Sequence, residues 1–339
     1  MLKFSVGYQF CEDTPFSSIV KQYAHGIEEV YFPWTDMATG RSLLSGYDGY
    51  TDYHLQNQLI QELQQIKACG VELNLLFNAN CYGDDAISRA LLGKICAIID
   101  FLSENGVMPE SVTTASPAIA YMIKEHYAQI RTKASVNMKI ASVKGMEYVA
   151  HLFDAYCVAK ECNRDIPRLR DLKTWANSNG KKITILANSG CMRDCSGQIF
   201  HDNMVAHEHA ISQKQNINFM PYMCWNHLKN KDNFVSILQN TWIRPEDIDR
   251  YEGLTDSVKL ATRAHALPAL VIGSYVRRKY FGNLPDLFEP GFGPAIAPHA
   301  IDSSKLPDDF WERTVNCDKK CETCDYCKQA LSRALVFAG

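Results

Sequence analysis

Short β-rich segments alternate with longer amphipathic segments over about the first 265 residues. Glycine often stands at the passage from an amphipathic segment to the next β-rich one, as Gly70 and Gly106 do. This alternation predicts a parallel sheet with helical crossovers. We predict strands at 4–8, 29–32, 72–77, 111–115, 133–137, 155–159, 183–187 and 257–261. We predict helices at 15–26, 55–68, 86–104, 117–128, 145–153, 167–177 and 269–280, and another that opens at 244–247.

Eight such units over this length fit a (β/α)8 TIM-type barrel, which is the fold class we predict. A doubly wound open sheet is the alternative, weakened by the absence of a Gly-x-Gly-x-x-Gly turn after the first strand. From residue 281 the composition shifts, and five of the thirteen prolines lie between 285 and 307. We therefore predict a barrel at 1–280 that carries the catalytic site. A proline-rich extension at 281–339 should be irregular, wrap the barrel and deliver a cysteine cluster.

Charge and hydropathy narrow the class of protein. The formal net charge is −3, which gives no basic footprint for nucleic acid. The N-terminus lacks the apolar region of a signal peptide, and no segment approaches the roughly 18 apolar residues that span a bilayer. We expect a cytoplasmic protein whose substrate is a small molecule or peptide.

The chain has thirteen cysteines, and six of them fall in two closely spaced groups. In a reducing compartment clustered cysteines indicate metal or redox chemistry, because disulfides are rare there. The isolated Cys69, Cys96 and Cys157 stand in apolar surroundings, and we interpret them as small core residues.

The first cysteine group directly follows the predicted strand 183–187. Cys191 and Cys195 are four residues apart, so a helical turn would put both sulfurs on one side. Cys224 directly follows a run at 218–223 that we predict to be extended, and it is the best candidate for a third ligand. The fourth ligand could be Cys162, Cys11, Cys81 or a group other than cysteine. Alternatively, one iron could have no protein ligand.

The second group places four cysteines within eleven residues near the C-terminus. A closely spaced run suits a four-iron cluster, whose irons accept ligands from one short loop. Zinc, which favours two separated pairs, is the alternative. The metal ligands that we predict here are Cys317, Cys321, Cys324 and Cys327.

Polar residues after strands seven and eight are candidates for substrate contacts. Asn188, Arg193, Lys259 and Arg263 could bind a carboxylated substrate or donor, or form rim salt bridges. His201, His207 and His209 follow Cys195 but lack the His-Glu-x-x-His pattern of zinc peptidases. We predict a proton-transfer role for His207, with helix-surface histidines as the alternative.

Three stretches together resemble the collagenase-like peptidase family of unassigned catalytic type (U32). They are 162–165, 187–195, and 242–248 leading to 257–263. The resemblance implies an iron–sulfur barrel protein like the family's oxygen-independent hydroxylases of transfer RNA, ribosomal RNA or ubiquinone precursors. Prephenate is the implied oxygen donor for some of these. The resemblance implies that Cys191 and Cys195 are cluster ligands and that Cys224 is a third. The C-terminal cysteines depart from the family pattern.

Three functions follow from these observations. The first is a redox enzyme with one or two [4Fe-4S] clusters that hydroxylates or otherwise modifies a small molecule or peptide. The net acidity argues against RNA as its substrate. The second is a peptidase with Cys191 as nucleophile and His207 as base. The third is a non-enzymatic electron-transfer or assembly protein whose C-terminal group contacts a protein partner or electron donor.

Overall fold

Eight parallel strands close into a barrel in the computed structural model, which describes residues 1–11, 14–40 and 51–338. β1 pairs with both β2 and β8, so the sheet has no free edge and the open-sheet alternative is excluded. The strands are β1 Phe4–Gly7, β2 Ile27–Pro33, β3 Glu72–Phe77, β4 Ser111–Thr114, β5 Arg131–Ala134, β6 Ala155–Cys157, β7 Lys182–Leu186 and β8 Ser257–Leu260. The predicted TIM-type barrel is therefore confirmed.

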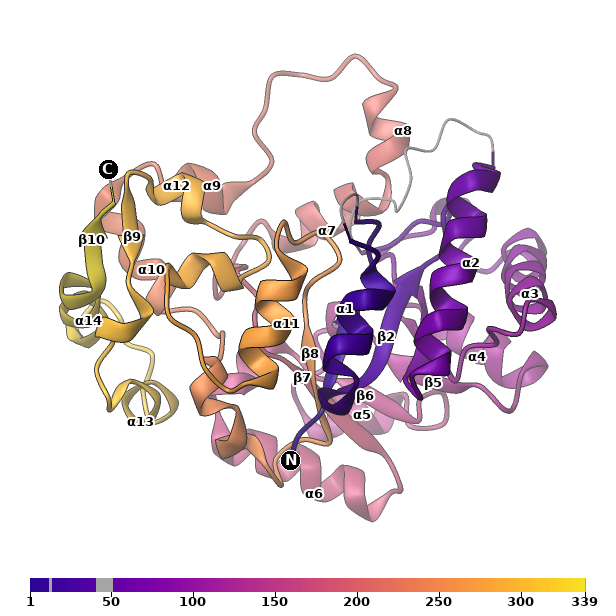
Figure 1. Ribbon diagram of the computed structural model, residues 1–339, viewed down its shortest axis with the longest axis horizontal. Coiled ribbons are helices and arrows are strands. Elements are labelled where there is room, and N and C mark those ends of the chain that lie inside the picture. The colour runs from indigo at the N-terminus through magenta and orange to yellow at the C-terminus, as the bar shows by residue number, and fades with distance from the viewer. Residues whose placement is uncertain (12–13, 41–50, 339) are drawn as a thin grey trace.

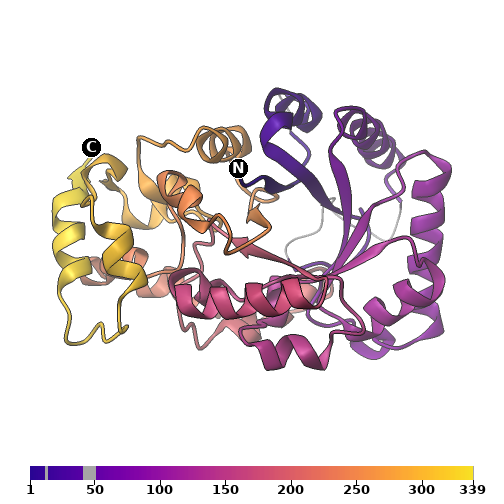
Figure 2. The same cartoon turned by 90° about the horizontal axis from the view of Figure 1, so that it is seen from below.

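Helices cover the outside of the barrel (Figures 1 and 2). They are α1 Phe16–Tyr23, α2 Tyr53–Ala68, α3 Arg89–Glu104, α4 Pro117–His126, α5 Val143–Tyr148, α6 Ile166–Ser178 and α11 Pro268–Val276. Side chains cap the N-termini of several of these helices: Ser88, Ser116 and Asp165 each accept a hydrogen bond from the backbone N–H three residues on. The segment predicted to open a helix at 244–247 forms a 3-10 helix instead, Pro245–Tyr251.

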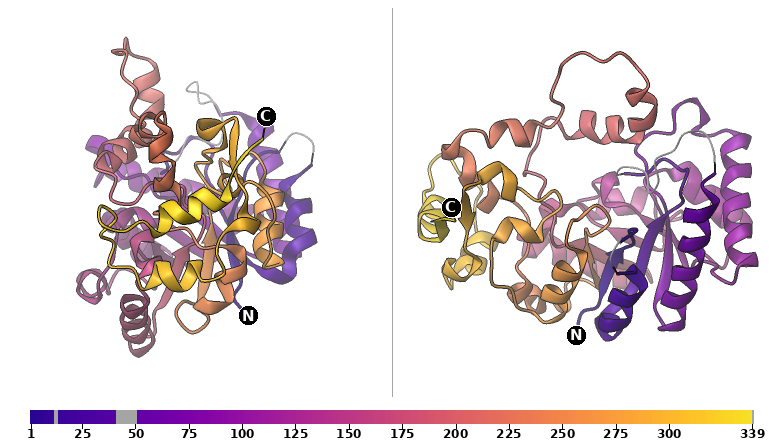
Figure 3. Two further views of the ribbon diagram at one scale, coloured as in Figure 1. Left: turned by 90° about the vertical axis from the view of Figure 1, so that its left-hand side faces the viewer. Right: turned by 45° about the horizontal axis from the view of Figure 1, so that its top comes forward.

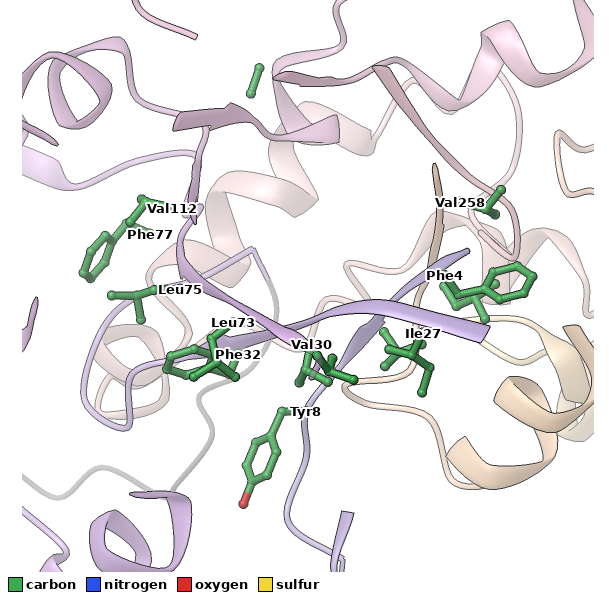
Figure 4. Packing of buried hydrophobic residues seen from close by; sticks show 14 of the residues in the cluster. Phe4, Tyr8, Ile27, Val30, Phe32, Leu73, Leu75, Phe77, Val112 and Val258 are labelled. Atoms are coloured by element: carbon green, nitrogen blue, oxygen red, sulfur yellow. The ribbon is translucent and has the colours of Figure 1, made fainter. Parts of the chain in front are cut away.

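The two faces of the strands differ in polarity. Alternate residues such as Phe4, Val30 and Leu73 are fully buried and belong to the main apolar core (Figure 4). The residues between them are polar. Glu29 on β2 accepts hydrogen bonds from Ser5 and from Asn74, and it pairs with Lys133 on β5. Because β3 and β4 separate β2 from β5, this ion pair crosses the interior of the barrel.

The connection between β7 and β8 is long and projects from the barrel mouth (Figure 3). It contains α7 Gln198–Ala206, α8 Glu208–Ser212, α9 Met223–His227 and α10 Val235–Leu238. The extended run predicted at 218–223 is wrong as a strand, because 218–222 form no regular element and Met223 begins α9.

The C-terminal extension is more ordered than the sequence suggests. It contains α12 Gly293–Ile296, α13 Phe310–Val315 and α14 Tyr326–Ala334, and β9 His299–Ile301 pairs antiparallel with β10 Leu335–Phe337. It lies beside the barrel rather than wrapping it (Figures 1 and 2). A second apolar core joins this extension to the β7–β8 connection through residues such as Trp242, Phe288 and Phe310. The predicted domain division at residue 280 stays a prediction.

No helix in the described ranges has the length and apolar content needed to cross a lipid bilayer.

Candidate functional site: two cysteine-lined pockets

The end of β7 is fixed to its neighbours by Asn188. Its side-chain Nδ2 donates to the carbonyls of Ala261 and Leu287, both at 2.9 Å, and its Oδ1 accepts from Ala261 N at 2.6 Å. The side chain is fully buried. Asn188 therefore joins β7, β8 and the C-terminal extension through three backbone contacts, rather than pointing at a substrate.

The following turn is held against the C-terminal extension at Gly190. Its N–H donates to the carbonyl of Glu289 at 3.0 Å, and its carbonyl accepts from Asn240 at 2.8 Å. A Cβ atom built on Gly190 would lie 2.0 Å from the carbonyl oxygen of Pro290. Lys160 then donates to the carbonyls of Cys191 and Met192. The backbone of the loop that carries Cys191 is thus held by hydrogen bonds to three other parts of the chain.

Cys191, Cys195 and Cys224 line one cavity of ≈ 500 Å³ at the C-terminal ends of β7 and β8, which we call the mouth pocket. Burial, followed by the neighbouring thiols of Cys191 and Cys195, raises the pKa of Cys224 to about 11. A thiol with a raised pKa is a poor nucleophile until a cation or metal ion removes its proton. The three predicted mouth ligands are therefore brought together.

Cys317, Cys321, Cys324 and Cys327 line a second cavity of ≈ 580 Å³, which we call the tail pocket. Burial raises the pKa of Cys327 to about 11, with the other three thiols adding to the effect and Arg164 opposing it. The Sγ of Cys317 accepts a hydrogen bond from the backbone N–H of Lys319 at 3.2 Å. All four predicted tail ligands thus share one pocket.

Three arginines line the tail pocket, namely Arg164, Arg193 and Arg313. Arg164 is buried with its guanidinium carbon 4.9 Å from the ring centre of Trp242 and 5.5 Å from that of Phe310, and burial lowers its pKa to about 10. Arg193 donates to the Sγ of Cys321 at 3.2 Å and also lines a shallow cavity with Cys195 and Cys224. Arg193 and Gln239 each line both the tail pocket and the cavity that holds Cys195 and Cys224.

The two cysteine groups can be compared with the ligand geometry that zinc and iron–sulfur clusters require. Among the residues of the described ranges, no three His, Cys, Asp or Glu side chains could hold one metal ion as they stand. A single zinc ion needs its donors to converge on one point at about 2.0–2.3 Å. A four-iron cluster takes one thiolate on each iron, so its thiolates stand farther apart around a cavity. The four thiols of the tail pocket are soft sulfur donors, which suit either zinc or an iron–sulfur cluster.

The candidates for a fourth mouth ligand lie elsewhere. Cys162 is fully buried in the main core, and burial raises its pKa to about 11. Cys11 packs against the main core, and the Sγ of Cys81 accepts from Gly83 N at 3.4 Å. None of the three lines the mouth pocket. The isolated Cys157 is buried, whereas Cys69 and Cys96 are half-buried.

The predicted polar site residues are dispersed. His207 lies beside Gly83, whereas His201 lines the mouth pocket with its ring 5.1 Å from that of Tyr222. The Nζ of Lys259 lies 3.8 Å from the centre of the Tyr31 ring, and Arg263 donates to Thr39 at 2.9 Å. Burial lowers the pKa of Lys259. Lys259, Arg263 and Arg193 all lie outside the lining of the mouth pocket.

Sequence reasoning missed three residues of the mouth pocket: His265, Asp286 and Glu289. The Nδ1 of His265 accepts from Leu267 N at 2.9 Å, and a second hydrogen bond joins the ring to the backbone of Asp286. Burial lowers the pKa of His265, although Glu289 opposes this. A neutral ring whose Nδ1 accepts carries its proton on Nε2, so His265 is a donor there and not a base. No sequence pattern marks these residues, because only folding brings them to the cysteines.

No family model matches the chain. It is 25% identical over 285 residues to a protein of Methanocaldococcus jannaschii named as an uncharacterized protease, covering 82% of this chain and 81% of that one. The solved structure of a U32 peptidase superposes with a TM-score of 0.53 at 14% identity, covering 77% of this chain and 92% of that one. The second likeness shows the shared fold.

Proposed function

From the likeness to the M. jannaschii protein and to the U32 peptidase, we propose that this chain belongs to the U32 collagenase-like peptidase family and is an iron–sulfur-dependent redox enzyme that acts on a small molecule or peptide. One observation carries the proposal: four tail thiols line a single pocket beside Arg164 and Arg193. Thiolates are the ligands that iron–sulfur clusters use. The three arginines that line this pocket would offset the negative charge that such a ligand set accumulates.

The residues divide between the two pockets. Cys317, Cys321, Cys324 and Cys327 would hold a complete [4Fe-4S] cluster, and the three mouth cysteines would supply three ligands of another. A bound cluster supplies one-electron redox chemistry. The mouth pocket would hold the substrate, and its apolar walls, which include Trp225 and Phe288, would exclude water. We propose oxygen-independent hydroxylation, or a related modification, as the class of reaction.

A peptidase is the second candidate, favoured by the name of the M. jannaschii relative, an uncharacterized protease. Cys191 shares the mouth pocket with His201 and His265. However, His207 lies outside that pocket, and both ring nitrogens of His265 are engaged with backbone. A cysteine–histidine pair needs a ring nitrogen that can take the thiol proton. An electron-transfer protein without catalysis is the third candidate, favoured by the exposed Cys324 in the tail pocket.

The test is iron, sulfide and zinc content together with EPR, on protein purified without oxygen. The variants are Cys191→Ala/Cys195→Ala and Cys321→Ala/Cys324→Ala, with Cys69→Ala/Cys96→Ala as the control at isolated cysteines. We expect iron in the wild type, loss of iron in each cluster variant and no change in the control. Zinc without iron would overturn the proposal. Hydrolysis of peptides by iron-free protein would favour the peptidase.

A further inference from the structure

The carboxylate side chains that line the mouth pocket are not matched there by any lysine or arginine of the described ranges. They belong to Glu208, Asp286 and Glu289. The cations that the sequence suggested for substrate binding are used elsewhere: Arg193 contacts Cys321, and Lys259 faces Tyr31 inside the barrel. A carboxylate ligand would therefore meet three acids and neither a lysine nor an arginine of the described ranges.

The two inner acids are fixed by hydrogen bonds to neighbouring residues. Glu289 is 6% exposed and accepts from the backbone N–H of Ala264 at 3.2 Å. Asp286 is half-buried and accepts from Asn283 Nδ2 at 2.9 Å. Burial raises the pKa of Asp286. A cation placed beside a desolvated carboxylate restores favourable electrostatics, because the charged pair replaces the lost hydration.

Most of the remaining lining is apolar, although Gln198, His201, Tyr222 and His265 also contribute to it. Met192 and Phe288 are buried in the second core, and the ring of Trp225 packs edge-on to that of Phe292 at 5.7 Å. Leu267, at the rim, is 53% exposed. A cavity of ≈ 500 Å³ with such walls suits the hydrocarbon or aromatic body of a small organic molecule.

We infer that the mouth pocket binds a primary amine with an apolar body, its ammonium group beside Asp286 and Glu289 and its body against Phe288 and Trp225. The inference rests on the proposed function only in taking this pocket as the substrate site. Charge complementarity selects the cation over a carboxylate, and the apolar walls select an organic cation over an inorganic one. The occupant is thus an amine substrate, or the amino group of a short peptide.

The test uses three probes of similar body: phenethylamine, 3-phenylpropionate and 3-phenylpropanol. Their dissociation constants are measured by calorimetry on oxygen-free wild type, Asp286→Asn and Glu289→Gln, with Glu104→Gln on α3 as the control. We expect the amine to bind about tenfold or more tighter than the carboxylate, as one charge-assisted contact gives. Each inner-acid variant should weaken the amine about tenfold and change the alcohol by less than about twofold.

Equal or tighter binding of the carboxylate would overturn the inference, as would amine binding that neither inner-acid variant weakens. Because Glu289→Gln alters a buried contact, Asp286→Asn at the half-buried position serves as the independent variant. Iron content of each sample separates the two proposals. Amine binding by protein that holds no iron would leave this inference standing and defeat the redox proposal; iron without amine binding would do the reverse.

Discussion

The guanidinium of Arg193 donates from Nη2 to the Sγ of Cys321 over 3.2 Å and joins segments 128 residues apart in the sequence. The same side chain pairs with Asp194 at 3.1 Å. Burial opposes its charge, but Cys321 and Asp194 outweigh burial and raise the pKa of Arg193. A positive charge is thereby held between the mouth cysteines and the tail cysteines.

Arg193→Gln removes that charge. For protein that holds a tail cluster, we expect a lower midpoint potential, because the cation stabilises the more negative reduced state. The expected shift is on the order of 60 mV, which corresponds to about 1.4 kcal/mol for one electron. EPR-monitored redox titration measures it, and Arg170→Gln on the exposed side of α6 is the control. An unchanged potential in Arg193→Gln would show that the contact does not tune the tail group.

Asn188→Ala should destabilise the fold. Its three contacts to backbone are lost, and the buried groups of Ala261 and Leu287 are left without partners. We expect a loss of about 2–4 kcal/mol in the free energy of unfolding, measured by urea denaturation. Asn177→Ala, at an exposed position on α6, should change it by less than about 0.5 kcal/mol. Lost activity with an unchanged free energy of unfolding would instead give Asn188 a catalytic role.

The barrel was predictable because each strand carries its own signal. β3 has the predicted bounds, 72–77, and the polar residues Glu29 and Asn74 alternate with buried apolar ones. The C-terminal extension carries no comparable signal. α13 is only six residues long, and its Phe310 is buried by stacking on Trp242 from a distant segment. Short elements that depend on such contacts leave little periodicity in the sequence.

The candidate site also contains residues that the sequence predicted and residues that it did not. Spacing alone selected the tail cysteines, and the structure brings them to one pocket. Polar residues at strand ends were ambiguous, because a position that can face substrate can equally bind backbone, as Asn188 does. His265 and Glu289 carry no local signal, since the loop after β8 and the C-terminal extension meet only in the folded chain.

Gly190→Ala should disturb the mouth pocket directly. The added methyl group would meet the carbonyl of Pro290 at 2.0 Å, so the segment that carries Glu289 must move. We expect a loss of about 2–3 kcal/mol in the free energy of unfolding, together with weaker binding of the amine probe. Gly93→Ala on α3 is the matched control, because its added methyl group meets nothing within 4 Å. That change should stabilise the helix by about 0.5–1 kcal/mol. Equal effects of the two substitutions would contradict the close contact at Gly190.

The Glu29–Lys133 pair inside the barrel predicts a pH-dependent contribution to stability. Burial disfavours the carboxylate, but Lys133, Ser5 and Asn74 outweigh burial and hold the pKa of Glu29 at about 2, below its ordinary 4.5. A lowered carboxyl pKa contributes stability that is complete above about pH 4.5 and is lost as the pH falls toward 2. Glu29→Gln should therefore cost roughly 3 kcal/mol at pH 7 and clearly less at pH 3. Urea denaturation at both pH values measures the difference in the free energy of unfolding between the wild type and Glu29→Gln, with Glu104→Gln as the exposed control. If this difference were the same at pH 7 and pH 3, the ionised form of Glu29 would not stabilise the barrel.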